Sequence, residues 1–262
     1  MSRVESVVVA ERFMTIGFLA PQRDIRIFAH RGLAAGVPEN TLAAFSAAVA
    51  AGADYIETDV HVTHDGVCVI HHDPVVEVAG TSWRIAEVSY ETLRGLDLGQ
   101  GETIPTLADA LGAFPEVRFN IDVKVLDAAG PAARAIIDAA AMDRVLVTSF
   151  DERTRRAALD LLPGVATSAS SAKIIAALPW MLLGVPSRVA AALRGIPAVQ
   201  IPEKRGPLRL VSPRIVRLMH RAGIEVHVWT INDPADMARL HDWGVEGIVT
   251  DRCDVAIRMT RR

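Results

Sequence analysis

Cysteine is nearly absent from this chain, since only Cys68 and Cys253 occur among its 262 residues. Two cysteines are too few for a disulfide framework, and their separation matches no zinc-ligand spacing. An excess of charge is also lacking, because 28 basic and 31 acidic side chains leave a formal net charge of −3. Without a basic excess the chain is not expected to bind nucleic acid.

The first 24 residues lack the apolar core of a secretory signal, because Glu5, Glu11 and Arg12 interrupt it. We therefore expect a cytoplasmic protein. Half of the chain is apolar, which suffices for the core of one large α/β domain or of two small ones. We expect one domain to span residues 25–262, with residues 1–24 as an N-terminal extension packed on it.

A long unbroken apolar run is missing as well. The nearest candidate, residues 174–193, is apolar except for Ser187 and Arg188 but contains Pro179 and Pro186. These residues make it a poor membrane-spanning helix. We interpret it as buried helical segments of the domain. A segment that lies on a membrane surface is the alternative, and it would make the protein peripherally membrane-associated.

Apolar, β-branched runs alternate with Ala- and Leu-rich helical stretches along the chain. The predicted strands are 25–30, 55–62, 117–125, 145–150, 165–169, 198–201, 225–231 and 247–250. Predicted N-caps of the intervening helices are Asn40, Asp151, Ser212 and Asp233. Strands with helical crossovers over this length predict an α/β fold, a (β/α)8 TIM barrel. A doubly wound sheet is less favoured, because no strand precedes a Gly-rich phosphate fingerprint.

Residues 73–107 are too long and irregular for a simple crossover after the second strand. We expect them to form a small excursion over the barrel mouth.

Two carboxylates, Glu57 and Asp59, lie two residues apart in a predicted strand and therefore point to the same face. Adjacent carboxylates repel each other at an apolar site unless a cation neutralises them. Ligands that offer only oxygen suit one divalent cation, Mg²⁺ or Ca²⁺.

The dipeptide Asp65-Gly66 predicts a two-residue hairpin turn after this strand. Counting back along both arms pairs Asp59 with His72, and directly opposed residues share a face. His71 would point to the other face. The sequence thus predicts that His72 is the site histidine.

Further polar residues stand at the ends of the neighbouring predicted strands. His30 ends the first strand, next to Glu57 in a barrel, and Arg31 follows it. Asp122 and Lys124 share one face of the third strand, so Asp122 can supply a third carboxylate and Lys124 a cation for a phosphate oxygen. Acid, base, metal and charge clamp are the parts that phosphoryl chemistry requires.

An ordered set of motifs resembles the glycerophosphodiester phosphodiesterase family over nearly the whole chain from residue 27 onward. The motifs are HRG (30–32), PENT (38–41), ExD (57–59), TxDG (63–66), HD (72–73), IPTL (104–107), the strand with Asp122 and Lys124, SF (149–150), WTIN (229–232) and TD (250–251). Any one of them alone is common, whereas the ordered set is specific.

The resemblance implies metal-dependent hydrolysis of a small-molecule glycerophosphodiester to an alcohol and glycerol 3-phosphate. In this family route the neighbouring glycerol hydroxyl attacks phosphorus, and water opens the resulting cyclic phosphate. The residues carried over by analogy are His30 and His72 as acid/base pair, Glu57, Asp59 and Asp122 as metal ligands, Arg31 and Lys124 as phosphate contacts, and Trp229 as an apolar wall against glycerol.

The chain departs from the family pattern at three places. Asp122 stands where the family usually has Glu, the usual Leu-x-Arg after the HDP segment is missing, and residues 174–193 are unusually apolar. Two alternatives therefore stay open: lysophospholipase D-type activity on lysophospholipids, and a catalytically silent barrel that binds phosphodiesters.

The other histidines match no family position. We interpret His227 as a satisfied core histidine, and we expect His61, His64, His220 and His241 to be exposed strand-end, turn or helix residues.

Overall fold

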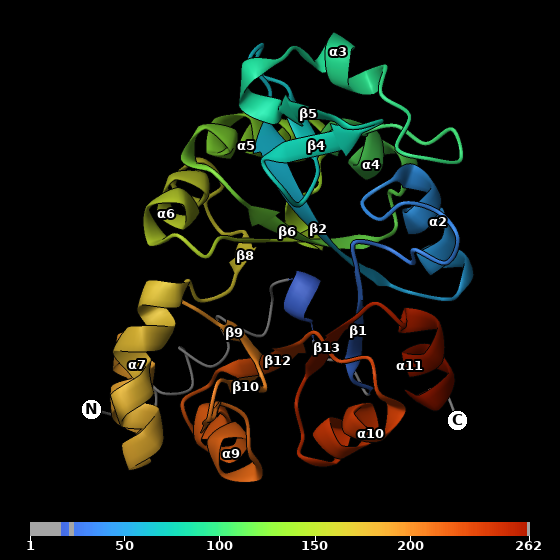
Figure 1. The fold of residues 1–262 in the computed structure, drawn as a ribbon. Helices are drawn as coiled ribbons and strands as arrows, with labels where there is room; N and C mark the ends of the chain where they lie inside the picture. The colour runs from blue at the N-terminus through green and yellow to red at the C-terminus, as the bar shows by residue number, and fades with distance from the viewer. Residues whose placement is uncertain (1–16, 21–23, 261–262) are drawn as a thin grey trace.

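The computed structural model describes residues 17–20 and 24–260, which form a ring of eight parallel strands (Figure 1). The strands are β1 (Arg26–His30), β2 (Tyr55–Val62), β6 (Arg118–Val123), β7 (Val145–Thr148), β8 (Ala166–Thr167), β9 (Ala198–Pro202), β12 (Glu225–Trp229) and β13 (Gly247–Thr250). Neighbours follow in the order β8-β7-β6-β2-β1-β13-β12-β9, and an isolated parallel bridge from Ser168 to Ala198 closes the ring. The predicted barrel is confirmed, and each predicted strand overlaps an observed one.

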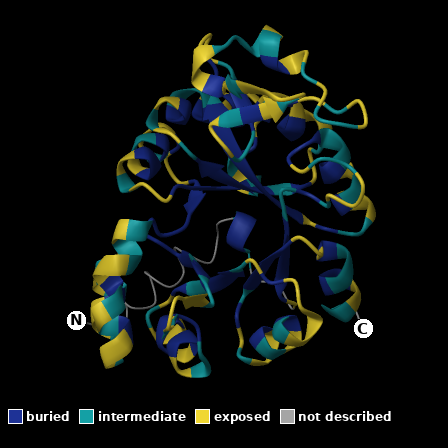
Figure 2. Ribbon diagram, in the orientation of Figure 1, coloured by how far each residue is buried: buried dark blue, intermediate teal, exposed yellow. Residues whose placement is uncertain are grey.

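Helices surround the ring, with their outer faces exposed and the strands buried (Figure 2). They are α2 (Leu42–Ala50), α4 (Leu107–Ala113), α5 (Ala129–Asp138), α6 (Glu152–Leu161), α7 (Ser171–Leu183), α8 (Pro186–Ala192), α9 (Pro213–Arg221), α10 (Pro234–Asp242) and α11 (Cys253–Thr260), with 3₁₀ turns η3 (Leu126–Ala128) and η4 (Met142–Arg144). The side chains of Asp151, Ser212 and Asp233 accept hydrogen bonds from the first-turn amides, as predicted. Helix α2 differs, because Thr41 caps it in place of Asn40.

Alternation along the strands separates two apolar layers. Ile27, Ile56 and Val147 point outward and pack with the helices in one large buried cluster. Phe28 and Tyr55 point inward and pack with residues of β7, β8, β9 and β13 in a second cluster inside the ring. Burying one such side chain stabilises the fold by about 1.5–3 kcal/mol.

A short segment that precedes the first strand in the sequence lies inside the ring. The 3₁₀ turn η1 (Gly17–Leu19) lies in the middle of the ring (Figure 1), and Phe18 is fully buried there. The Phe18 ring lies 5.2 Å from that of Tyr55 and 6.2 Å from that of Phe28. Gly247 leaves room for this packing, since a Cβ there would lie 2.6 Å from the Phe28 ring. The remainder of the expected extension 1–24, apart from Ala20 and Asp24, lies outside the described residues.

The expected excursion forms a separate small unit after β2. Strand β3 (Cys68–Ile70), which pairs with β2, leads into it, and the unit contains β4 (Val75–Val78), β5 (Thr81–Arg84), η2 (Ile85–Glu87) and α3 (Tyr90–Arg94). Val76, Ile85 and Leu93 are buried in an apolar cluster separate from the main core, whereas Cys68 and Ile70 of β3 belong to the main core. The unit extends to one side of the ring, beyond β2, and does not cross the mouth (Figure 1). A second small hairpin joins β10 (Lys204–Arg205) to β11 (Leu208–Arg209).

The register predicted for the β2–β3 hairpin is wrong by one residue. Val62 pairs with Cys68 and Val60 with Ile70, so the position opposite Asp59 belongs to His71 and not to His72. The loop is longer than two residues because Thr63 closes it: its amide bonds the Val67 carbonyl, and its hydroxyl accepts from the Val67 amide.

Candidate active site

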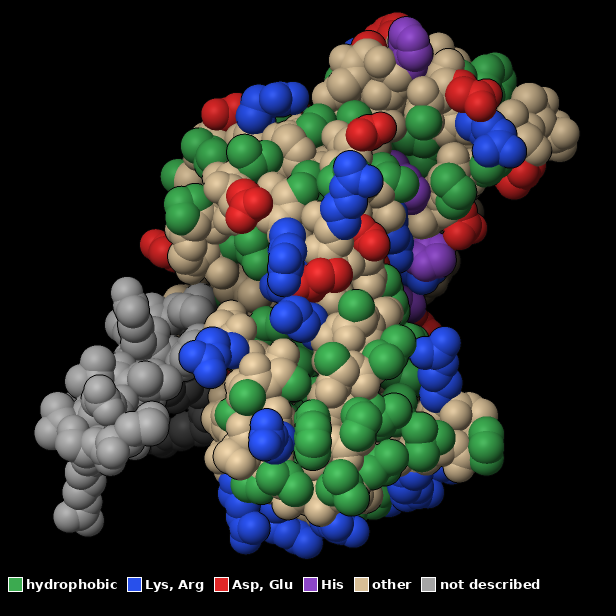
Figure 3. All heavy atoms as spheres, turned by 90° about the vertical axis from the view of Figure 1, so that its left-hand side faces the viewer, with side chains coloured by type: hydrophobic (Ala, Val, Ile, Leu, Met, Phe, Trp, Pro, Cys, Tyr) green, Lys and Arg blue, Asp and Glu red, His purple; other side chains and the backbone are tan. Residues whose placement is uncertain are grey.

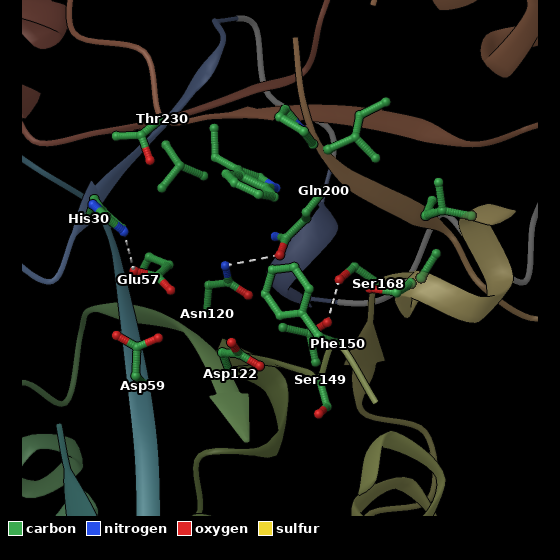
Figure 4. A pocket seen from close by; sticks show the side chains of 18 of the residues that line it. His30, Glu57, Asp59, Asn120, Asp122, Ser149, Phe150, Ser168, Gln200 and Thr230 are labelled. Atoms are coloured by element: carbon green, nitrogen blue, oxygen red, sulfur yellow. Dashed lines mark hydrogen bonds and ion pairs between the residues drawn. The ribbon is translucent and has the colours of Figure 1, made fainter. Parts of the chain in front are cut away.

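A pocket of about 730 Å³ opens at the carboxyl ends of the barrel strands. All eight residues that the sequence analysis selected line it: His30, Arg31, Glu57, Asp59, His72, Asp122, Lys124 and Trp229. Figure 4 shows His30, Glu57, Asp59 and Asp122 on neighbouring strands, facing a common space. The strand register explains this, because His30 pairs with Glu57, and Asp59 with Asp122.

The HRG motif makes a sharp turn at the end of β1. Arg31 and Gly32 both have positive φ, 56° and 86°. A side chain at Gly32 would place Cβ 2.7 Å from the Ala44 backbone, so only glycine fits here. The turn returns the Arg31 amide to the Glu57 carbonyl at 2.8 Å and places its guanidinium 3.3 Å from Asp59.

Lys124 lies between two of the three carboxylates. Its Nζ is 2.6 Å from Asp59 Oδ1 and 2.8 Å from Asp122 Oδ2. Burial alone would lower the pKa of Lys124, but the charges of Asp122 and Asp59 outweigh it and raise the pKa. Lys124 therefore stays a cation at the base of the pocket.

Glu57 has no such partner. Its Oε2 is buried without a hydrogen bond, and its nearest cationic candidate is His30 Nε2 at 3.8 Å. Burial, then the charges of Asp59 and Asp122, raise the pKa of Glu57 well above its usual value. Burial also raises the pKa of Asp122, whose Oδ1 is likewise buried without a partner. Around Glu57 the three carboxylates thus outnumber the two cations that act on it, Lys124 and Arg31.

Asn40 orients Asp59, a role that the sequence analysis did not assign. This residue is 3% exposed and has a left-handed backbone with φ 57°. Its Nδ2 donates to Asp59 Oδ2 at 3.1 Å, while its Oδ1 accepts from the Thr58 hydroxyl at 2.8 Å. The side-chain amide is therefore fixed at both ends. The signal that could have found it is the asparagine in PENT, since Asn tolerates a left-handed backbone better than most residues.

A second residue without a predicted role, Asp251, contacts His30. Its Oδ1 lies 2.6 Å from His30 Nδ1, and its Oδ2 accepts from Asn232 Nδ2 at 2.7 Å. The hydrogen bond with His30 lowers the pKa of Asp251. An ionised Asp251 requires a proton on His30 Nδ1, which leaves Nε2 facing Glu57 and the pocket. Asn232 lies in WTIN and Asp251 in TD, two of the motifs that carry the family resemblance.

Of the two adjacent histidines, His72 is the one at the pocket, but the predicted strand register is not the reason. His72 lines the pocket and its Nδ1 lies 2.8 Å from Asp73 Oδ1, whereas His71 is absent from the lining. Strand β3 has already ended at Ile70, so strand alternation does not govern these positions. The expectation that His61 is exposed is wrong: it is 5% exposed, and its Nε2 lies 3.1 Å from the His72 carbonyl oxygen.

An apolar wall and a polar floor complete the pocket. The rings of Trp229 and Phe150 meet edge to face at 5.9 Å, and Phe150 is 57% exposed. On the floor Asn120 donates to Gln200, whose amide lies 3.4 Å from His227. His227 is fully buried, as the interpretation of a core histidine requires.

The donor chemistry of the pocket fits a divalent cation. Glu57, Asp59 and Asp122 offer hard oxygen ligands, and one buried oxygen of Glu57 and one of Asp122 have no hydrogen-bond partner. Within residues 17–20 and 24–260 no three acidic, histidine or cysteine side chains converge into a finished ligand cluster. In this structure Lys124 forms ion pairs with one oxygen of Asp59 and one of Asp122, and its ammonium group lies between these two carboxylates.

Comparison with known proteins gives the same family along the chain. The model of the glycerophosphoryl diester phosphodiesterase family matches residues 30–255. A probable glycerophosphodiester phosphodiesterase of Mycobacterium tuberculosis is 41% identical over 230 residues, which cover 87% of each chain. A lysophospholipase D of Rattus norvegicus is 26% identical and covers 86% of this chain and 83% of its own length.

Solved structures share the fold. A phosphodiesterase of Oleispira antarctica, solved with its product sn-glycerol-3-phosphate, superposes with a TM-score of 0.75 at 24% identity, and covers 90% of this chain and 97% of its own.

Proposed function

The chain belongs to the glycerophosphoryl diester phosphodiesterase family, and we propose that it hydrolyses glycerophosphodiesters to an alcohol and glycerol 3-phosphate with a divalent cation. The observation that carries this proposal is one pocket. It is lined by the three carboxylates, both motif histidines and the two basic residues at the mouth of a barrel that the family model matches.

We assign Glu57, Asp59 and Asp122 as the residues that would hold the cation. When bound there, a Mg²⁺ or Ca²⁺ ion would acidify the attacking hydroxyl and neutralise charge on the phosphoryl oxygens. The charge surplus around Glu57 supports this assignment, since burial and then the neighbouring carboxylates raise its pKa, and a bound cation would favour its ionised form.

The protein groups supply proton transfer and orientation. His30 and His72 line the pocket and serve as the acid/base pair: one takes the proton of the attacking glycerol hydroxyl, and the other protonates the leaving alkoxide. Arg31 and Lys124 clamp the phosphate, and Trp229 with Phe150 covers the apolar side of glycerol. Because the nucleophile is attached to the substrate, the pocket only has to orient it.

The test measures glycerol 3-phosphate released from glycerophosphocholine and glycerophosphoethanolamine. We expect turnover that stops in chelator, returns with Mg²⁺ or Ca²⁺, and is lost in His30→Ala. The matched control is His241→Ala, which removes an exposed helical histidine away from the pocket. Turnover that persists undiminished in chelator or in His30→Ala would overturn the proposal.

A second candidate function is lysophospholipase D activity at the same site. It is supported by the rat relative and by two apolar residues of α7 that line the pocket, Ile174 and Ile175. Lysophosphatidylcholine turnover that exceeds glycerophosphocholine turnover would support this candidate, and the reverse preference would remove it.

A further inference from the structure

The outward face of α7 carries apolar side chains where a surface helix normally carries polar ones. Its exposed residues follow helical spacing: Ala172, Ile175, Ala176, Pro179, Leu182 and Leu183. Ile175, Leu182 and Leu183 are 61%, 49% and 66% exposed. The opposite face of the helix packs inward through Ala177 and Met181. We call the six exposed residues the apolar stripe.

Basic residues surround this stripe. Residues 164–224 contain nine lysines and arginines and a single acidic residue, Glu203, in a chain whose net charge is −3. The exposed basic residues of this segment are Arg188, Arg194, Lys204, Arg205, Arg209, Arg214, Arg217 and Arg221. Of these eight residues only Arg209 has an acidic partner in the described part of the chain, Glu203 at 3.5 Å. The segment is therefore strongly cationic and largely without neutralising partners on the protein.

The two features lie on one face of the molecule. Figure 3 shows apolar side chains gathered on the lower part of this face, with Lys and Arg side chains beside and below them and acidic ones only higher up. Two contacts tie the charges to the stripe. The Arg214 guanidinium donates to the Leu182 carbonyl at 3.4 Å, and that of Arg188 lies 5.4 Å from the Trp180 ring.

We propose that this face docks onto the surface of an anionic lipid membrane, with the apolar stripe in the acyl boundary and the basic residues against the headgroups. An apolar helical stripe between cationic flanks is the pattern of helices that lie in a membrane interface. A duplex nucleic acid would match the charges but would leave the stripe facing a polar backbone. A second copy of the chain would place two cationic faces together.

The docked helix lies on the membrane and does not cross it. No helix in the described part of the chain is long and apolar enough to span a bilayer. The apolar stripe adjoins the pocket, because Ile175 belongs to both, and the basic hairpin residues Lys204 and Arg205 also line the pocket. Docking therefore brings the rim of the pocket to the lipid surface.

The test is co-sedimentation of the full chain with vesicles. We expect at least tenfold stronger binding to vesicles of equal parts phosphatidylglycerol and phosphatidylcholine than to pure phosphatidylcholine. The variant Leu182→Gln/Leu183→Gln should lose at least tenfold of this binding. Its control is Ile137→Gln/Leu161→Gln, which removes two similarly exposed apolar side chains, 53% and 50%, from α5 and α6.

A second variant tests the charges independently. Arg194→Gln/Arg217→Gln/Arg221→Gln should weaken vesicle binding and reduce its salt dependence, while Arg134→Gln on α5 should not. Equal vesicle binding by wild type and both multiple variants would overturn the proposal. Absence of binding to anionic vesicles would also overturn it. This holds even if the same face bound duplex DNA, or a second copy of the chain as measured by sedimentation velocity. The readout uses no substrate, so it stands apart from the proposed hydrolysis.

Discussion

His30 Nδ1 and Asp251 Oδ1 lie 2.6 Å apart, at the ends of two neighbouring strands, β1 and β13. Asp251 is held in turn by Asn232, whose side chain donates to Oδ2 and accepts from the Asp251 amide. A carboxylate on one ring nitrogen fixes the tautomer and the orientation of the other nitrogen. Asp251 is thus a positioning residue for His30.

Replacement of Asp251 by Asn should lower kcat about 10–100-fold with little change in KM, because the ring loses its orienting anion. Asp254→Asn, at a carboxylate that pairs with Arg252 and Arg258, is the control. A lower melting temperature with an unchanged kcat would indicate a purely structural role.

The histidine doublet allows a matched pair of variants. His72→Ala should reduce kcat at least 100-fold, the usual contribution of a general acid or base. His71→Ala, one residue earlier and outside the pocket lining, should change kcat less than threefold. Steady-state kinetics with glycerophosphocholine measures both. Equal losses in the two variants would contradict the assignment of His72.

Glu57 connects metal binding with stability. Its pKa is raised by burial and by the charges of Asp59 and Asp122, so the folded state binds a proton more tightly than the unfolded chain. Its contribution to stability therefore falls as the pH rises above the usual carboxyl pKa. In chelator at pH 7, Glu57→Gln should be more stable than wild type by about 1 kcal/mol. Denaturant unfolding measures the difference.

Added Mg²⁺ or Ca²⁺ should reverse that order, because a ligand that binds only the folded state stabilises it. The wild type should gain stability and Glu57→Gln should gain little. Glu39→Gln, at an exposed carboxylate bonded to Arg31, is the comparison. If the cation stabilised Glu57→Gln and Glu39→Gln equally, the metal would have to bind at another site.

Glu152, at the start of α6, should make the free energy of unfolding depend on pH in the acid range. Burial alone would raise its pKa, but hydrogen bonds from Arg155, Ser170 and Arg156 lower it to about 2. The stabilisation is complete above the unfolded pKa near 4.5 and is lost as the pH falls toward 2. The stability difference between wild type and Glu152→Gln should thus shrink from at most about 3 kcal/mol at pH 6 toward zero near pH 2. A difference independent of pH would refute the ion-pair origin.

The residue at the centre of the ring, Phe18, should carry much of the stability of the barrel interior. It is fully buried, so Phe18→Ala should cost about 3–5 kcal/mol. Phe150→Ala, at a ring 57% exposed, should cost well under 1 kcal/mol. Urea unfolding of both variants gives the comparison. Similar costs for the two would mean that η1 does not pack in the ring in solution.

The sequence was sufficient to predict the barrel, and which side chains meet at its mouth, because both depend on strand periodicity. Side chains two apart share a face, and ends of neighbouring parallel strands meet, so Glu57, Asp59 and Asp122 converge without further information. The hairpin register was not predictable from Asp65-Gly66, because the Thr63 hydroxyl closes a longer loop.

Contacts that depend on tertiary packing were also beyond the sequence. Asp251 meets His30 across 221 residues, and nothing local marks that pairing. The burial of His61 follows from a bond to the His72 carbonyl, which exists only once the loop after β3 is folded. The stripe on α7 was assigned to the core because an apolar run by itself does not tell which of its residues face water.

The ring of strands is paired least extensively between β8 and β9. Strand β8 has two residues, Ala166 and Thr167, and it meets β9 through the single bridge at Ser168 and Ala198. Ser168 and Ala169 also line the pocket, and a wall joined by so few backbone hydrogen bonds is expected to open locally at a lower free-energy cost than the fully paired strands. We expect local opening at this junction to admit larger ligands than the closed pocket does.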